Sequence, residues 1–114
     1  MSEDRLQQEC YMWYHNKYPE YRGLLFHVPN GGARNAREGA KFKSMGVYPG
    51  VSDFLFMGDG KTACIELKTK VGKLSKKQEK WRDLVNEQGF KYFVVRTLPD
   101  FRKVIRYLMN NEIT

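Results

Sequence analysis

Residues 51–68 read VSDFLFMGDGKTACIELK, two apolar runs joined by Gly58-Asp59-Gly60. Asp-Gly is a preferred dipeptide at the centre of a two-residue type I′ hairpin turn, where both central residues need positive φ. In that register Asp53 lies opposite Glu66 on two antiparallel strands, with their Cβ atoms about 5 Å apart. Because two facing carboxylates repel each other, an apolar hairpin that carries them needs a compensating cation.

Lys68 lies two residues beyond Glu66 and projects from the same strand face, because strand side chains alternate. Two carboxylates and one ammonium on a rigid sheet suit a hard divalent ion bound to a phosphate. We therefore predict a metal-dependent nuclease. Two alternatives stay open. A three-residue loop would place Asp53 opposite Ile65 unless a bulge restored the pairing, and the charges could simply keep a sheet edge soluble.

The composition favours one domain, residues 1–114, that binds a polyanion. The chain has 114 residues, of which 41% are hydrophobic and 14% aromatic, which argues against disorder. A formal net charge of +7 points to nucleic acid. No apolar run approaches the roughly 20 residues that span a bilayer, so no membrane partner is expected.

The cysteines and the N-terminus indicate a cytoplasmic protein. The chain opens with Met1-Ser2-Glu3-Asp4, which is acidic and lacks the basic start of a signal peptide. Cys10 and Cys64 lie far apart within apolar patterns, as buried thiols of a reducing compartment do. Because no paired Cys or His spacing occurs, no zinc site is predicted.

The first half of the chain predicts a helix over residues 3–18, a strand over 24–28 and a basic segment over 33–45, either a helix or an ordered loop. The first helix has a core-facing stripe with Glu9 at its edge. The stripe consists of Leu6, Cys10 and Trp13. On the other flank we expect an exposed aromatic strip that serves a subunit contact, formed by Tyr11, Tyr14 and Tyr18.

The second half predicts hairpin strands over 51–57 and 61–68, a helix over 74–88, a buried strand over 90–95 and a final helix from about 97. Ser75 and Gln78 match a capping box. The strand after that helix is expected to run parallel to the second hairpin strand. The final helix should bury Phe101, Val104, Ile105 and Leu108. These elements form a small mixed central sheet flanked by helices, an α/β fold.

The order of elements and motifs resembles the restriction-endonuclease-like PD-(D/E)XK superfamily. Within it, the chain is similar to the VRR-NUC family, especially its small stand-alone phage and bacterial members. The resemblance covers nearly the whole chain. It rests on Glu9, Pro49-Gly50-Val51-Ser52-Asp53, Ile65-Glu66-Leu67-Lys68 and Gly72-Lys73-Leu74-Ser75 followed by Gln78 and Trp81.

This resemblance implies Mg²⁺ or Mn²⁺ held by Asp53, Glu66, the carbonyl of Leu67 and Glu9. Lys68 would hold the attacking water or the phosphate, and Gln78 would lie near the metal-bound waters as well as capping its helix. The activity implied is hydrolysis of DNA phosphodiester bonds by an endonuclease. Stand-alone members are associated with branched DNA, so a homodimer that cuts four-way (Holliday) junctions is the expected form, in phage or bacteria and thus in the host cytoplasm.

DNA contacts are predicted for two basic groups. One consists of His27, Asn30, Arg34 and Arg37, and the other of Lys70, Lys73, Lys76, Lys77 and Lys80. Trp13 and Trp81 are expected in the core rather than as stacking platforms. Two alternative functions remain: a flap or nicking nuclease of phage replication or packaging, and a non-catalytic nucleic-acid-binding protein on the same fold.

Overall fold

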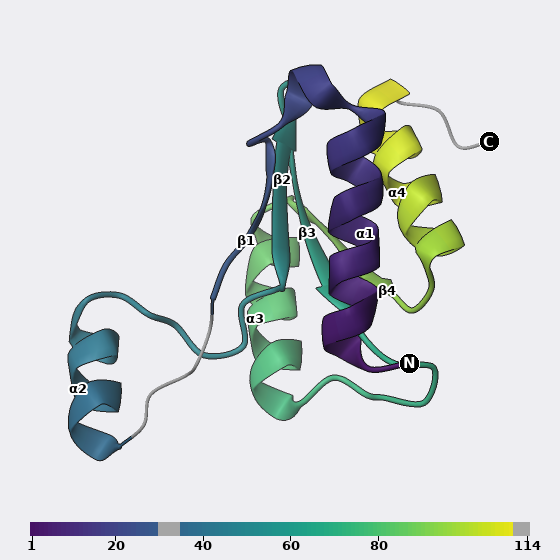
Figure 1. Ribbon diagram of the computed structural model, residues 1–114. Helices are drawn as coiled ribbons and strands as arrows, with labels where there is room; N and C mark the ends of the chain where they lie inside the picture. Colours follow the sequence, from purple (N-terminus) through teal and green to yellow (C-terminus); the bar gives the residue numbers. More distant parts are fainter. Residues whose placement is uncertain (30–34, 111–114) are drawn as a thin grey trace.

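Figure 1 shows the computed structural model of the chain, which describes residues 1–29 and 35–110. A mixed sheet has the strand order β1-β2-β3-β4. Neighbouring strands are antiparallel except β3 and β4, which are parallel. The elements are α1 Glu3–Lys17, a 3-10 helix Pro19–Tyr21, β1 Leu25–His27, α2 Ala36–Ser44, β2 Phe54–Gly58, β3 Lys61–Leu67, α3 Lys76–Glu87, β4 Lys91–Val95 and α4 Leu98–Asn110.

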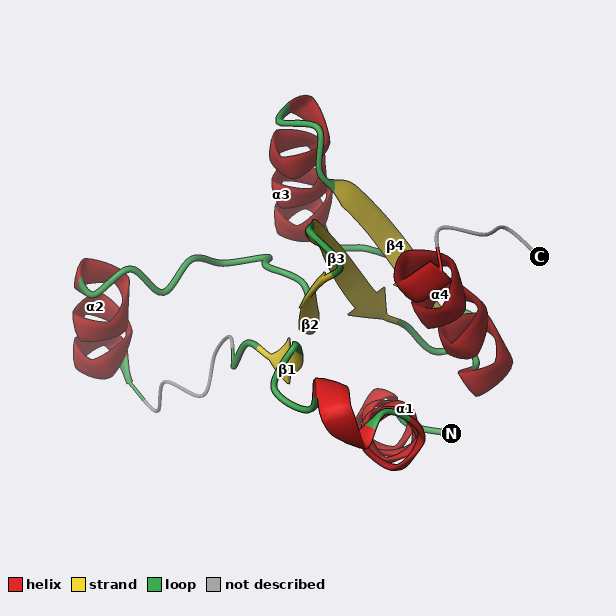
Figure 2. Cartoon of the chain, turned by 90° about the horizontal axis from the view of Figure 1, so that it is seen from above, coloured by secondary structure: helices red, strands yellow, loops and turns green. Residues whose placement is uncertain are grey.

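The sheet separates α3 on one side from α1 and α4 on the other (Figure 2). This is the mixed α/β fold predicted from the sequence, and the predicted parallel pairing after the second helix is confirmed. Helix α3 provides the crossover that a parallel pair requires.

The hairpin has the two-residue turn. Gly58 pairs with Lys61 and Phe54 with Ile65. Asp59 and Gly60 have φ of 54° and 71°, the positive values that a type I′ turn demands. Continued by one residue, this register places Asp53 opposite Glu66, so the three-residue loop is excluded.

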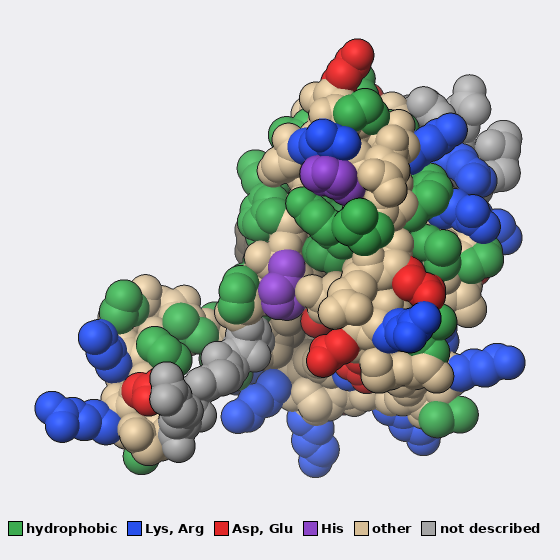
Figure 3. Space-filling view, viewed as in Figure 1, with side chains coloured by type: hydrophobic (Ala, Val, Ile, Leu, Met, Phe, Trp, Pro, Cys, Tyr) green, Lys and Arg blue, Asp and Glu red, His purple; other side chains and the backbone are tan. Residues whose placement is uncertain are grey.

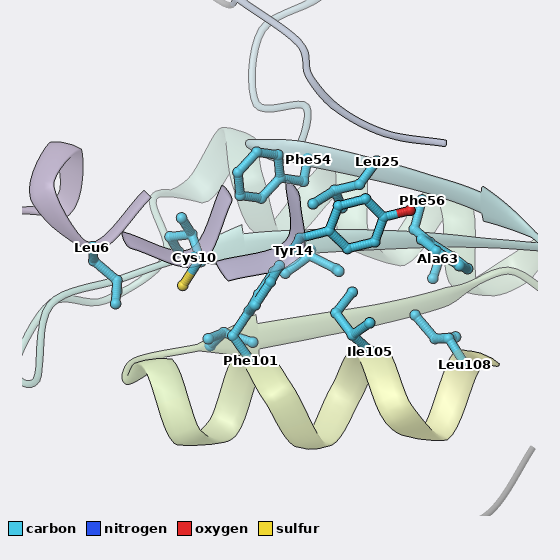
Figure 4. Packing of buried hydrophobic residues seen from close by; sticks show 13 residues of the cluster. Leu6, Cys10, Tyr14, Leu25, Phe54, Phe56, Ala63, Phe101, Ile105 and Leu108 are labelled. Carbon is cyan, nitrogen blue, oxygen red and sulfur yellow. The ribbon is translucent and has the colours of Figure 1, made fainter. Parts of the chain in front are cut away.

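The hydrophobic core lies between the sheet and the two helices α1 and α4 (Figure 4). Alternate residues of β3 enter it, namely Ala63, Ile65 and Leu67. Helix α4 contributes the three predicted residues Phe101, Ile105 and Leu108, while Val104 is only partly buried. Cys10 and Cys64 are buried free thiols, as predicted.

The prediction of an exposed tyrosine strip was wrong. Tyr14 is 1% exposed and belongs to the core, where its hydroxyl donates a hydrogen bond of 2.7 Å to the carbonyl of Tyr21. Tyr11 and Tyr18 are partly buried against the same cluster. Because α1 packs against both the sheet and α4, its covered arc is wider than the stripe read from Leu6, Cys10 and Trp13.

Strand β4 is less buried than the sequence suggested. Of its residues only Val95 is buried, because β4 is an edge strand of the sheet. Trp81 of α3 is half-buried in an edge-to-face contact with Tyr92, with ring centroids 6.1 Å apart. It lies outside the main core cluster, so its predicted core position is correct only in part.

The basic segment that the sequence predicted as either a helix or an ordered loop contains helix α2. The side chain of Asn35 caps this helix by accepting a hydrogen bond of 2.9 Å from the amide of Glu38. None of the α2 residues is buried, and the helix stands apart from the sheet (Figure 1). Among the described residues, no helix is long and apolar enough to cross a bilayer.

Candidate active site

Asp53 is held at the start of β2 by three hydrogen bonds. Its carbonyl oxygen accepts from the amide of Val28 at 3.0 Å and from Nδ1 of His27 at 2.7 Å. Its carboxylate oxygen Oδ2 accepts from the amide of Leu67 at 2.8 Å. Asp53 therefore ties the edge strand β1 to the end of β3, and its carboxylate is fixed beside Glu66.

Glu66 is the buried acid of the site, with 2% of its surface exposed. Burial and the neighbouring Asp53 carboxylate raise the pKa of Glu66 to about 8, and the ammonium of Lys68 opposes this increase. Its Oε1 is buried without a hydrogen-bond partner among the described residues. A buried carboxylate oxygen without a partner is costly, so this position favours a proton or a cation.

Gln78 connects α3 to Glu66 through both ends of its side-chain amide. Oε1 accepts from the amide of Ser75 at 2.8 Å, and Ser75 Oγ in turn accepts from the amide of Gln78 at 3.1 Å. This is the predicted capping box. The other end, Nε2, donates to Glu66 Oε2 at 3.1 Å. Capping the helix and contacting the acid are therefore compatible, because each uses a different atom.

Gly50 brings the loop before β2 against the N-terminal turn of α3. It has φ of 88°, and a Cβ at this position would overlap the carbonyl group of Lys77. Only glycine allows both the positive φ and this close approach. The Pro-Gly pair seen in the sequence thus places Asp53 and Gln78 on the same side of the sheet.

Lys68 is 8% exposed and its Nζ lies 3.8 Å from Glu66 Oε2. The amide of Lys68 donates to the carbonyl of Val95, which holds the end of β3 against β4. The four residues predicted for catalysis are thus close together: Gln78 and Lys68 contact the side chain of Glu66, and the Asp53 carboxylate raises its pKa. Their predicted catalytic roles stay predictions.

Glu9 does not join the carboxylate pair. Its side chain is 37% exposed and lies 3.8 Å from Arg5 on the same helix. It lines a cleft with Thr69 and Arg96, whereas Asp53 lines a different one. Among the described residues no three His, Cys, Asp or Glu side chains converge as a metal site. The predicted ligand role of Glu9 has no support from this geometry.

The predicted DNA-contacting lysines are all exposed. They lie on the loop after β3 and on the first turns of α3, and are Lys70, Lys73, Lys76, Lys77 and Lys80. Figure 3 shows basic side chains along the lower edge of the molecule, below the end of the sheet. Arg37 is exposed on α2, away from this edge. Asn30 and Arg34 lie outside the described residues.

His27 is exposed, and its Nδ1 must carry the proton because the Asp53 carbonyl can only accept. This contact makes His27 a support for the backbone of Asp53. Its predicted DNA contact is not tested by this arrangement.

Sequence reasoning missed Arg96. Its Nη1 donates to the carbonyl oxygens of Thr69 and Gly72, each at 2.7 Å, and lies 3.5 Å from that of Lys70. Arg96 therefore fixes the loop that carries the first lysines. No sequence signal distinguishes it from other basic residues, because its partners are backbone atoms more than 20 positions away.

A mixed sheet with an acid before one strand, and a Glu-x-Lys motif on the next, defines a nuclease-type domain of the PD-(D/E)XK class. The model of the VRR-NUC domain family matches residues 1–98, and the chain belongs to this family. A solved structure described as a VRR_NUC domain protein has the same fold. It aligns with a TM-score of 0.79 and 21% identity over 96% of this chain and 89% of that one. No curated protein matched the chain.

Proposed function

We propose that the chain is a Mg²⁺- or Mn²⁺-dependent endonuclease that hydrolyses DNA phosphodiester bonds, selecting branched DNA. The observation that carries this proposal is the buried carboxylate of Glu66, which has one oxygen without a partner and lies beside Asp53. A purely structural sheet would gain stability from an apolar side chain at that position. A binding protein also has no reason to place carboxylates where phosphates must approach.

A divalent cation fits the donors that the site offers. Asp53 and Glu66 provide hard carboxylate oxygens, and Mg²⁺ commonly takes only one or two of these together with waters and substrate phosphate. The amide of Leu67 points at Asp53, and its carbonyl is expected at the same strand edge because the two groups of one strand residue point the same way. These three residues would hold the metal; Glu9 is not needed.

The protein groups around such a metal have separable roles. A bound divalent ion would supply an acidified water and neutralise charge on the phosphate. Lys68 provides a buried positive charge beside Glu66, suited to holding the attacking water or a phosphate oxygen. Gln78 fixes the orientation of the Glu66 carboxylate through its 3.1 Å hydrogen bond. Tight positioning of this kind lowers the entropic part of the barrier.

DNA would approach along the surface formed by the five exposed lysines. We call this surface the lysine edge; it consists of Lys70, Lys73, Lys76, Lys77 and Lys80. The exposed lysines begin two residues after Lys68, so a phosphate backbone that contacts them passes the proposed metal site. Contacts of this kind are electrostatic and independent of sequence. Selection of DNA by its shape follows, since contacts to the phosphate backbone read no base sequence.

We also propose that the chain forms a homodimer, with helix α2 at the interface instead of the tyrosines of α1. Helix α2 buries none of its residues, and Met45 directly after it is 71% exposed. The radius of gyration is 14.7 Å, against about 13 Å for a compact chain of this length. A second copy that covers this arm would give a two-fold dimer, whose paired sites match the symmetry of a four-way junction. Light scattering should then show a dimer that Met45→Glu dissociates and Met57→Glu does not.

The test of the activity is cleavage of labelled duplex, flap and four-way-junction DNA with Mg²⁺, with Mn²⁺ and with EDTA. Paired symmetric cuts in the junction, absent in Asp53→Ala and in EDTA, are expected. Cutting confined to flap or nicked DNA would contradict the four-way junction as the substrate. It would favour the alternative function, a flap or nicking nuclease of phage replication or packaging. Metal-independent binding with no cutting of any substrate would contradict the nuclease and leave a nucleic-acid-binding protein. A host-cytoplasmic location belongs to the same proposal.

A further inference from the structure

A cleft of about 630 Å³ opens between α1 and the edge strand β1, next to the proposed active site. Asp53 is one of its lining residues, so the cleft adjoins the carboxylate pair. The lysine edge does not contribute to it. What this cleft is suited to bind follows from its charge, its walls and its hydrogen-bonding groups.

The charge of the cleft argues against a phosphate. Among the described residues that line it there is no Lys or Arg, although the whole chain carries a net charge of +7. Its acidic members are Asp4 and Asp53. His27 also lines the cleft. Because two carboxylates without a Lys or Arg to offset them repel a phosphate, the lysine edge is the better position for the DNA backbone.

The walls of the cleft are apolar and aromatic. Tyr11 and Phe54 stack with ring centroids 6.3 Å apart and an angle of 22° between planes, and because Phe54 is 1% exposed this pair forms the floor of the cleft. Two large apolar side chains are left exposed at the cleft, Met12 at 51% and Phe26 at 37%. Hydrophobic side chains follow the seam between β1 and α1 in Figure 3. An exposed apolar surface beside a catalytic site marks a ligand-binding position, and a flat ring is the ligand that aromatic walls accommodate.

The polar groups of the cleft suit the edge of a nucleobase. Gln7 is half-buried and Gln8 exposed, and both line the cleft from α1. Each amide offers a donor and an acceptor, which is the pattern that base edges present. Aromatic stacking combined with such amides is how proteins hold bases that have left the helical stack.

We propose that this cleft binds one unpaired nucleobase of the DNA, next to the phosphodiester bond that the site cuts. A base in a duplex is stacked and paired and cannot enter, so the substrate class is DNA with an unpaired nucleotide at the cut. This inference rests on the proposed nuclease function and deepens it, since it gives the preference for branched DNA a physical origin: a flap offers unpaired bases directly, and a base at the branch point of a four-way junction must first leave its pair.

The experiment uses flap DNA in which 2-aminopurine replaces, one at a time, the unpaired nucleotides nearest the branch. Binding is measured in EDTA by anisotropy, together with the 2-aminopurine fluorescence, so that no cutting is required. The cleft variants are Phe26→Thr and Met12→Ser. The matched controls are Phe90→Thr and Met57→Ser, which replace residues of similar exposure outside the cleft.

We expect the fluorescence of one 2-aminopurine position to change on binding, and each cleft variant to lose that change. The cleft variants should bind the flap about tenfold more weakly, whereas the controls bind as the wild type does. A fully paired duplex should be bound alike by all of them. Thermal unfolding establishes that each variant is folded, and the second cleft variant carries the test if the first unfolds.

Unchanged fluorescence at every position, or cleft variants that bind the flap like the controls, would overturn the proposal. The result is separable from failure of the nuclease. A protein that cuts flaps without a 2-aminopurine response loses only the base site. One that shows the response and never cuts loses the nuclease function and keeps a base-binding cleft.

Discussion

Alternate residues of β3 lie in two different environments. Ala63, Ile65 and Leu67 enter the apolar core beneath α1 and α4, whereas Glu66 and Lys68 face the side of the sheet where α3 lies. On the first face every buried member is hydrophobic or a tyrosine with a satisfied hydroxyl. On the second, a carboxylate and an ammonium are buried together and α3 buries no residue completely.

In this chain of 114 residues, one face of the sheet provides the stability and the other carries the polar groups of the candidate site. Apolar burial stabilises at roughly 25 cal/mol per Å², so the core face supports the fold. Burying Glu66 and Lys68 costs desolvation energy that their contact repays only in part. The contact between Glu66 and Lys68 therefore does not stabilise the fold by itself. Gly50 and Gln78, which connect this face of the sheet to α3, hold the polar residues in position.

The largest expected effect is on the core face. Phe101→Ala should lower the free energy of unfolding by about 3–5 kcal/mol, because it removes a fully buried ring. Leu84→Ala, at an exposed position on α3, should change it by less than about 0.5 kcal/mol. Denaturant unfolding measures both. Equal losses of unfolding free energy would show that α3 shares the core and that the two faces of the sheet contribute equally to stability.

The second prediction concerns Glu66 and pH. Glu66 has a pKa raised to about 8 in the folded protein and an ordinary value of 4.5 in the unfolded chain. Between these values the unfolded chain binds fewer protons, so the free energy of unfolding should fall as pH rises through this window. The loss is on the order of a few kcal/mol in the absence of metal. Glu66→Gln should remove it.

The measurement for Glu66 is denaturant unfolding across that pH range in EDTA. Glu79→Gln, a substitution at an exposed acid of α3, is the control and should leave the pH dependence as in the wild type. Adding Mg²⁺ above about pH 8 should stabilise the wild type more than Glu66→Gln, because the substitution removes one of the two carboxylates that would hold the cation. A wild-type stability that is flat with pH would show that Glu66 is ionised without cost.

The third prediction separates charge from position at Lys68. Lys68→Ala should lower turnover on DNA about 100-fold, a loss of about 2.7 kcal/mol of transition-state stabilisation, with little change in metal affinity. Lys80→Ala removes an exposed lysine and should leave turnover unchanged at saturating DNA. Wild-type turnover in Lys68→Ala would exclude this ammonium from the chemistry.

The smallest expected effect is at Gln78, where capping and the acid contact can be tested apart. Gln78→Glu keeps an oxygen for the Ser75 amide but puts a carboxylate oxygen in place of the donor to Glu66, so the helix cap should persist while repulsion between the two carboxylates lowers turnover about tenfold. Gln78→Ala loses both contacts. If Gln78→Glu turned over DNA like the wild type, Gln78 would be a helix cap only.

Local chemistry explains what could be predicted. The Asp59-Gly60 turn fixes the hairpin register within a few residues, and Ser75 with Gln78 fixes the start of α3; both depend only on neighbours in the chain. Counting back from the turn along that register places Asp53 opposite Glu66. The same count places Lys68 two residues further on the same face.

The set of elements, and the face on which each strand residue lies, can therefore be predicted from local sequence patterns. Which faces are covered depends on the packing of the whole chain: Tyr14 lies in the core, β4 is an edge strand, and Glu9 lies apart from the carboxylates. The contact of Gln78 with Glu66 and the contacts of Arg96 with the lysine loop also come from it. The periodicity of a helix or strand specifies the side on which each of its residues projects. Burial and long-range hydrogen bonds depend on which other element packs against that side.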